Sequence, residues 1–274
     1  MYAIDFEYDG QYLSDYGFII CDFNGTYGIA EASAGSVITF NKVQRDKGKK
    51  YSLSSTQYSE CVSATFDICK NDEFWERDQL EITNDEYRDL MRWLNRREFL
   101  SFQLVDDTDE YETKESCFYD ASFNIEKILI NSKLYGLRLK METDKPFGYG
   151  QEQRVSWNFT DTGSPKNLSN ISDEIGSLYP TLIVTCMRNG DLSIHNELEG
   201  CTTVIKNCQV GEVITIHGDT QIITSSFLAH DICSDFNYDF FRIGNTIKTR
   251  SNMISVSMPC KLEIRYRPII KDSP

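Results

Sequence analysis

The chain has 274 residues, a length that suits one large or two medium domains, and its 40% of apolar residues excludes long disordered or fibrous segments. With 28 Lys and Arg against 42 Asp and Glu the formal net charge is −14, which argues against nucleic acid as a bound partner, because phosphate contacts need clustered basic side chains. The sequence has no apolar run of about 18 residues and no basic, apolar leader at its start, so we expect a soluble, non-secreted protein with no membrane partner.

Apolar residues alternate with polar ones in several runs of the first part. Residues 64–68, 100–104 and 137–142 show this period of two, and Asp9-Gly10 has the chemistry of a tight hairpin turn. Because successive side chains of a strand point to opposite faces, each run predicts a half-buried antiparallel strand.

One helix is expected, from about Asn84 to Arg97. Thr83 and Glu86 have the spacing of a capping box, and Ile82 and Tyr87 that of a hydrophobic staple. The apolar stripe is formed by Tyr87, Leu90, Met91 and Leu94, and the other faces carry Arg88, Arg92, Arg96 and Arg97. We favour solvated arginines that face the acids of their own domain over contacts to a phosphate backbone.

A domain boundary is predicted near Pro146. Residues 1–145 carry 17 basic and 28 acidic side chains and no proline, whereas residues 146–274 carry 11 and 14 and all six prolines. The segment 146–150 holds one proline and two glycines and reads as a linker. We therefore expect domains at 1–145 and 151–274, joined by 146–150.

The second part repeats the strand pattern. Residues 254–258 and 262–267 alternate, and turn dipeptides occur at Asn189-Gly190, Gly218-Asp219 and Gly244-Asn245, where we expect hairpins. No segment suggests the crossover helices of a parallel sheet. The fold class predicted is mainly β, with an N-terminal β-sandwich carrying one helix and a C-terminal β-sandwich.

Residues able to carry chemistry are few and scattered. The nine cysteines form no C-x-x-C pair, so free thiols in a reducing compartment are favoured over a zinc site or a disulfide framework. The histidines are His195, His217 and His230, and each would need partners from elsewhere in the fold. The common hydrolase, nucleotide and zincin motifs are absent. A cysteine nucleophile paired with a distant histidine stays open but is not favoured, so we name no catalytic, cofactor-binding or metal-binding residues.

Two charged runs and the tryptophans are the remaining candidates for binding sites. The acidic run 106–115 lacks the spacing of a calcium loop, and a solvated hairpin tip is favoured. The basic run Arg45–Lys50 fits an acidic neighbouring subunit or a plain exposed loop equally well. Trp75 and Trp93 are placed for a core rather than for stacking on sugars.

The layout resembles the distal tail protein (Dit) family of long-tailed bacteriophages and prophages. In the first part the resemblance rests on the opening 6–10, the helix 87–94 followed by 100–102, and the segment 145–149. In the second part it rests on the segments 179–184, 189–196, 211–219, 240–245 and 262–268, in the same order along the chain.

This resemblance implies a structural virion protein and not an enzyme, assembled in the bacterial cytoplasm, that forms a homo-hexameric ring. The N-terminal domains would line a channel and galectin-like, jelly-roll-type C-terminal domains would project outward. The ring would join the tail tube protein to the baseplate or tail tip and anchor the lysin, fibre or other adsorption proteins. DNA would pass without being specifically bound. The acidity of residues 1–145 suits such a lumen, and ordinary acidic solubility explains it equally well.

Two other classes stay open from the residues alone. A carbohydrate-binding or adhesin-type protein with two β-sandwiches is the main alternative, although no galectin-type H-x-N-x-R run occurs. A glycosidase that works through two carboxylates is the third class, but no pair of acids can be singled out.

Overall fold

The computed structural model describes residues 3–23, 31–33, 37–45, 50–106, 117–160 and 164–271. The chain divides into two compact units, Met1–Gly150 with Ile270–Pro274, and Gln151–Ile269. Both are built mainly of strands, and the one long helix lies in the first unit, so the predicted fold class is confirmed. Within the described ranges, no helix is both long and apolar enough to span a bilayer.

One antiparallel sheet forms the body of the first unit. Its strands are β1 (Ala3–Tyr8), β2 (Gln11–Tyr12), β3 (Phe18–Cys21), β7 (Ser63–Lys70), β8 (Leu100–Asp106), β9 (Phe118–Ile130) and β10 (Lys133–Thr143). They follow the order β2-β1-β8-β9-β10-β7-β3. Because β1 and β3, near opposite ends of this path, also contact each other, the sheet curls around its core.

Three short strands extend this sheet. The strand β4 (Glu31–Ser33) pairs with β7, and β11 (Gly148–Tyr149) pairs with β9 and with β23 (Ile269–Ile270). The end of the chain is therefore grouped with the first unit although it follows the second in sequence.

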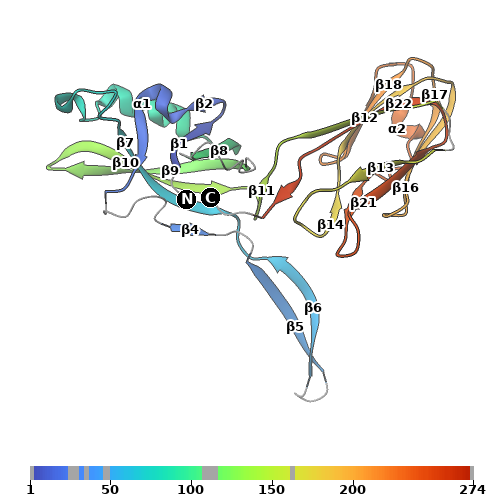
Figure 1. The fold of residues 1–274 in the computed structure, drawn as a ribbon, viewed down its shortest axis with the longest axis horizontal. Coiled ribbons are helices and arrows are strands. Elements are labelled where there is room, and N and C mark those ends of the chain that lie inside the picture. Colours follow the sequence, from blue (N-terminus) through green and yellow to red (C-terminus); the bar gives the residue numbers. More distant parts are fainter. Residues whose placement is uncertain are drawn as a thin grey trace. The chain divides into compact units, whose positions relative to one another are not determined.

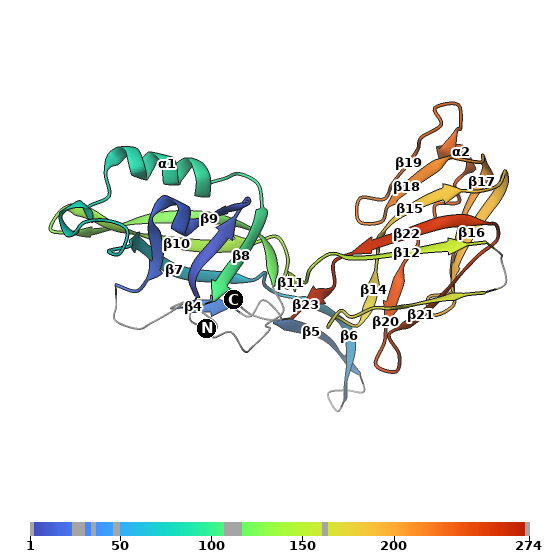
Figure 2. The same cartoon turned by 45° about the horizontal axis from the view of Figure 1, so that its top comes forward.

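The helix α1 (Asn84–Leu94) covers the open face of the sheet (Figure 2). Its capping box forms as predicted, since Glu86 N donates to Thr83 Oγ1 and Thr83 N donates to Glu86 Oε2. The helix ends three residues earlier than expected. The core beneath it is largely aromatic, with the Phe6 ring within 6.0 Å of Phe66, Trp93, Phe102 and Phe123. Two of these arginines face acids of their own unit as expected, because Arg92 pairs with Asp89 and Arg96 with Asp9.

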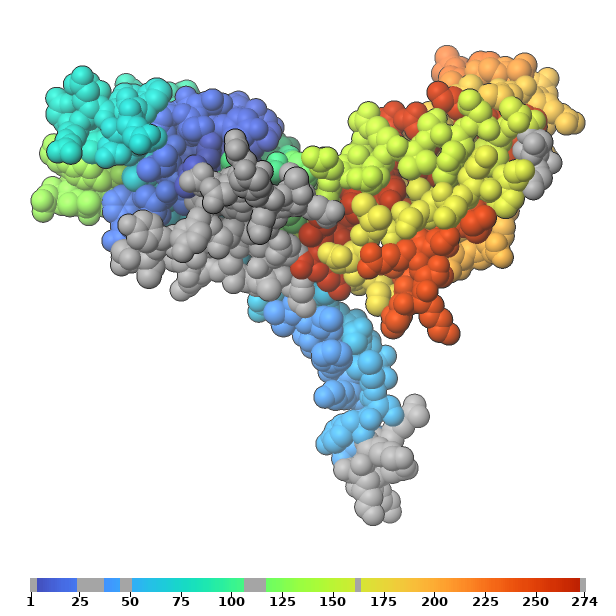
Figure 3. All heavy atoms as spheres, in the orientation of Figure 1, coloured from blue at the N-terminus to red at the C-terminus, as the bar shows by residue number. Residues whose placement is uncertain are grey.

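The hairpin of β5 (Ile38–Arg45) and β6 (Lys50–Tyr58) forms a sheet of its own. In the described part of the chain neither strand pairs with any other. Figures 1 and 3 show it as a two-stranded arm that stands clear of the sheet of its unit.

The second unit is a sandwich of two antiparallel sheets. The larger sheet has the order β12-β22-β15-β18-β19 and contains β12 (Gln153–Phe159), β15 (Thr181–Cys186), β18 (Val213–His217), β19 (Ile222–Ser225) and β22 (Cys260–Tyr266). The smaller has the order β13-β21-β16-β17 and contains β13 (Lys166–Ser169), β16 (Gly190–Asn196), β17 (Cys201–Cys208) and β21 (Ser251–Val256). Leu182, Ile216 and Ile264 from one sheet and Leu192, Ile205 and Ile254 from the other meet in the core.

Buried amides attach a third, two-stranded sheet to this sandwich. It consists of β14 (Gly176–Leu178) and β20 (Ile243–Asn245). The Asn252 side chain exchanges hydrogen bonds with both backbone groups of Gly244 in β20 and accepts one from Asn196. Each of these buried amides is thereby satisfied, as buried polar groups must be.

Two of the four predicted turns join paired strands, and two do not. Asp9 and Gly10 have positive φ values and join β1 to β2 as predicted, and Gly218-Asp219 lies in the loop between the paired strands β18 and β19. The hairpins predicted at Asn189-Gly190 and Gly244-Asn245 are wrong. The first dipeptide connects β15 and β16, which belong to different sheets, and the second lies within β20.

Candidate functional site

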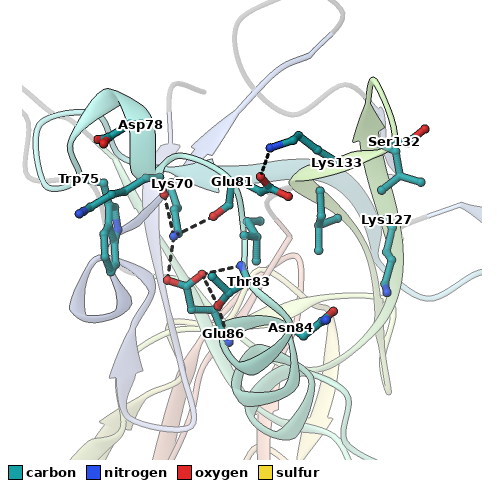
Figure 4. A pocket seen from close by; sticks show the side chains of 14 residues that line it. Lys70, Trp75, Asp78, Glu81, Thr83, Asn84, Glu86, Lys127, Ser132 and Lys133 are labelled. Carbon is teal, nitrogen blue, oxygen red and sulfur yellow. Dashed lines mark hydrogen bonds and ion pairs between the residues drawn. The ribbon is translucent and has the colours of Figure 1, made fainter.

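Three features of the described residues could carry a function: a pocket beside the start of α1, a buried histidine in the second unit, and the arm. The pocket has a volume of about 730 Å³ and lies between the segment before α1 and the β9–β10 turn (Figure 4). Its polar lining includes Lys70, Glu81, Glu86, Lys127 and Lys133.

The cation at the base of this pocket is fully engaged within the protein. Lys70 Nζ donates to the carbonyl oxygens of Gln79 and Glu81 at 2.9 and 3.1 Å and pairs with Glu86 Oε1 at 2.7 Å. It also lies 4.2 Å from the centre of the Trp75 ring. Burial opposes the charge on Glu86, but its bonds from Lys70 and Thr83 outweigh this and lower its pKa.

The other two lysines of the pocket are also occupied. Lys133 pairs with Glu81 at 2.5 Å, and Lys127 Nζ lies 4.0 Å from the centre of the Tyr87 ring. Each of the three lysines in the pocket therefore already has a partner within the protein. Lys70 in addition fixes the 3₁₀ turn Arg77–Gln79 and the start of α1 to β7. We interpret it as a structural junction.

The buried histidine lies between two carboxylates. His230 Nδ1 donates to Glu212 Oε1 at 2.5 Å, and its Nε2 lies 3.2 Å from Asp235 Oδ2, an ion pair without a hydrogen bond. Glu212 also accepts from Ser225 Oγ and from the Gln209 amide. The sequence gives no sign of a partner for His230, because Glu212 lies 18 positions earlier and outside any local motif.

Burial and pairing have opposite effects on the pKa values of His230 and Glu212. Burial lowers the pKa of His230, but the bond to Glu212 and its negative charge outweigh this, so the pKa is raised. Burial raises the pKa of Glu212, but its hydrogen bonds from Ser225 and His230 outweigh this and lower it. The His230 ring is enclosed by the fold and closed to a substrate, so we assign it to holding α2 (Ile232–Asp235) against the sandwich.

The arm has one apolar and one polar face. Residues paired across two strands share a face, and the pairings put Ile38, Phe40, Tyr51, Leu53 and Tyr58 on one side, together with the polar Lys42, Gln44 and Thr56. The opposite side carries Thr39, Asn41, Ser52, Ser55 and Gln57, with Val43. The Phe40, Tyr51 and Leu53 side chains are 55%, 66% and 58% exposed. The arm thus presents an apolar face that the described residues leave uncovered.

The comparisons with known proteins agree on a tail component. Residues 1–145 match the family described as Phage tail protein N-terminal domain, and residues 147–266 match the one described as Phage tail C-terminal domain. The chain belongs to this family of phage tail proteins. It is therefore a component of the phage tail.

The fold is shared with a solved tail structure. The Dit protein of phage SPP1, described as a paradigm of the hub adsorption apparatus in phages that infect Gram-positive hosts, matches with a TM-score of 0.65. The match covers 96% of this chain and 98% of that one at 12% sequence identity, so it shows the fold. The resemblance to the distal tail protein family is thus confirmed. No curated protein matches.

The other candidates from the sequence are the tryptophans, the two remaining histidines and the two charged runs. Trp93 is buried in the first core, and Trp157 packs against the second. His195 contacts Thr202 Oγ1, and His217 is exposed at the end of β18. Residues 46–49 of the basic run and residues 107–116, which include most of the acidic run, lie outside the described residues.

Replacing His230 by glutamine (H230Q) should destabilise the second unit in a pH-dependent way. Because the pKa of His230 is raised in the fold, its contribution is complete below about 6.5 and is lost as the pH rises through the raised value. Because the pKa of Glu212 is lowered, its contribution is lost only as the pH falls well below 4.5. Near pH 6 we expect a loss of about 3 kcal/mol in the free energy of unfolding.

Denaturant unfolding of the full chain across this pH range measures the effect. The matched control is His217→Gln, at an exposed histidine, which should change the free energy by less than about 0.5 kcal/mol. A difference between H230Q and wild type that does not shrink toward alkaline pH would contradict the assignment.

Proposed function

We propose that this tail protein is a hexameric hub that joins the tail tube to the baseplate or tail tip. The first unit would form the ring around a channel, and the second unit would project outward. The ring would anchor the lysin, fibre or other proteins of host adsorption, and the whole would assemble in the bacterial cytoplasm. The fold shared with a hub protein of another phage supports this role.

The observation that carries the ring is the apolar face of the arm. An isolated two-stranded hairpin is marginal in water, because it has no second layer to cover its apolar side. The strands β5 and β6 nevertheless run for eight and nine residues with Phe40, Tyr51 and Leu53 exposed together. A second copy of this chain would cover that face, and a repeated head-to-tail contact of this kind forms a ring when its rotation closes.

The charge of the first part supports the channel. A net charge of −11 on residues 1–145 repels DNA at short range, and six copies multiply that field around a common axis. Salt screens the repulsion beyond about 8 Å, so it acts on DNA within the lumen rather than on distant DNA. The hub would let DNA pass without holding it.

Substituting aspartate for Phe40 (F40D) should disrupt the ring. A carboxylate in place of the exposed Phe40 ring removes apolar contact and must be desolvated when the face is covered, so we expect assembly to weaken at least about tenfold. Native mass spectrometry and negative-stain images should show wild-type particles of six times 31.6 kDa and smaller species for F40D.

The matched control is Gln57→Asp, which adds the same charge to the polar face of the arm. It should assemble as the wild type does. Hexamers of F40D at wild-type concentrations, or a wild-type chain that is monomeric alone and in tails, would contradict the proposal.

Carboxylates of the first unit that face the lumen should speed DNA passage. Reversing them to lysine supplies phosphate contacts, so DNA ejection from phages with such tails should slow, most strongly at low salt. The same number of reversals in the second unit is the control. Ejection at the wild-type rate with reversed lumen charges would rule out this role for the acidity.

A further inference from the structure

Two cysteines lie together on the outer face of the first sheet. In the pairing of β3 with β7, Ile19 faces Cys69 and Cys21 faces Asp67, so the two cysteines are diagonal neighbours on one side. The residues that alternate with them, Phe18, Ile20 and Ile68, are buried in the core on the other side. Both thiols are half-buried, so a small reagent can reach them from solvent.

The two thiols also interact with each other. A hydrogen bond links the Cys21 and Cys69 side chains, and it lowers the pKa of Cys69 while it raises that of Cys21. Cys69 is then the thiol that ionises first, and Cys21 is the protonated neighbour that stabilises the thiolate. A nucleophilic thiolate beside a second thiol is the arrangement that reacts with disulfides and then resolves the product.

The local backbone allows the two sulfur atoms to close. A disulfide needs an S–S distance of about 2.05 Å and α-carbons within about 6.8 Å, somewhat closer than a typical diagonal pair in a sheet. Among the described residues β3 ends at Cys21, so closing the bond needs a shift at the end of a strand rather than in the middle of its ladder.

We propose that Cys21 and Cys69 form a reversible dithiol–disulfide site whose oxidant is a small-molecule disulfide such as oxidised glutathione. The Cys69 thiolate attacks one sulfur of the oxidant and expels the first thiolate. The Cys21 thiol then loses its proton, attacks the Cys69 sulfur and expels the second. Two electrons and two protons pass from the cysteines to the oxidant, which leaves as two thiols.

The bond would enclose the segment that carries the arm. The strands β4, β5 and β6 all lie between Cys21 and Cys69 in sequence, so the bridge would tie both ends of this segment to the sheet. A tail moves from the reducing cytoplasm to an oxidising exterior, where such bonds persist. The chemistry of the pair goes beyond the hub role and does not depend on it.

The chain contains internal controls for selectivity. Cys186 and Cys208 share the same kind of hydrogen bond, but both are 1% exposed in the core of the second unit. A reagent in solution cannot reach them while the fold is intact. Cys61 is exposed, and its own variant tests whether simple exposure is enough for reaction.

The test exposes the folded full-length chain to oxidised glutathione at mildly alkaline pH, followed by alkylation, proteolysis and mass spectrometry. We expect a Cys21–Cys69 cross-linked peptide, with Cys186 and Cys208 recovered as alkylated thiols. Dithiothreitol should reverse the cross-link. The variant Cys21→Ser should instead retain glutathione on Cys69, because no second thiol is present to displace it, and Cys61→Ser should cross-link as the wild type does.

Two results would overturn the proposal. One is wild-type protein that retains glutathione on Cys69 without a cross-link, and the other is a Cys186–Cys208 bond that forms at least as fast. Loss of the ring in the F40D variant should leave the cross-link unchanged, so a failure of the hub role and a failure of this site are distinguishable.

Discussion

Each strand of this protein places alternate side chains on opposite faces, so every sheet has an apolar face that something must cover. The first sheet covers its own by curling around an aromatic core and by taking α1 across the opening. The two sheets of the second unit cover each other. The arm has the same alternation but no second layer among the described residues, and this difference is why we propose that it is an interface.

Polar groups buried at the edges of the two cores hold the irregular segments in place. Lys70 ties the start of α1 to β7 through two carbonyl groups and one carboxylate, and His230 ties α2 to the second sandwich through Glu212. Each is fully buried and paired, so loss of one partner would leave a charge in the interior. Such groups position the chain: Lys70 Nζ and His230 Nδ1 bond within the protein, while His230 Nε2 faces Asp235 without a hydrogen bond.

Local sequence patterns predicted where helices and strands form, but not which strands pair or which distant side chains meet in the fold. The alternation at 137–142 and 262–267 became β10 and β22, and the capping box at Thr83 and Glu86 formed as written, because both depend on residues close in sequence. Asn189-Gly190 has turn chemistry, but which strands pair across it depends on the whole sandwich, and there it connects two sheets. The pairs His230–Glu212 and Cys21–Cys69 join residues far apart in sequence and have no local signature.

The central claim is that the apolar face of the arm is covered by a second copy in the assembled tail. Hydroxyl-radical footprinting of intact tails and of the isolated chain, read by mass spectrometry, tests it directly because it reports the solvent exposure of each side chain. We expect Phe40, Tyr51 and Leu53 to react several-fold less in tails than in the isolated chain, while Val43 on the opposite face changes little. Equal reactivity of Phe40, Tyr51 and Leu53 in both states would contradict the account.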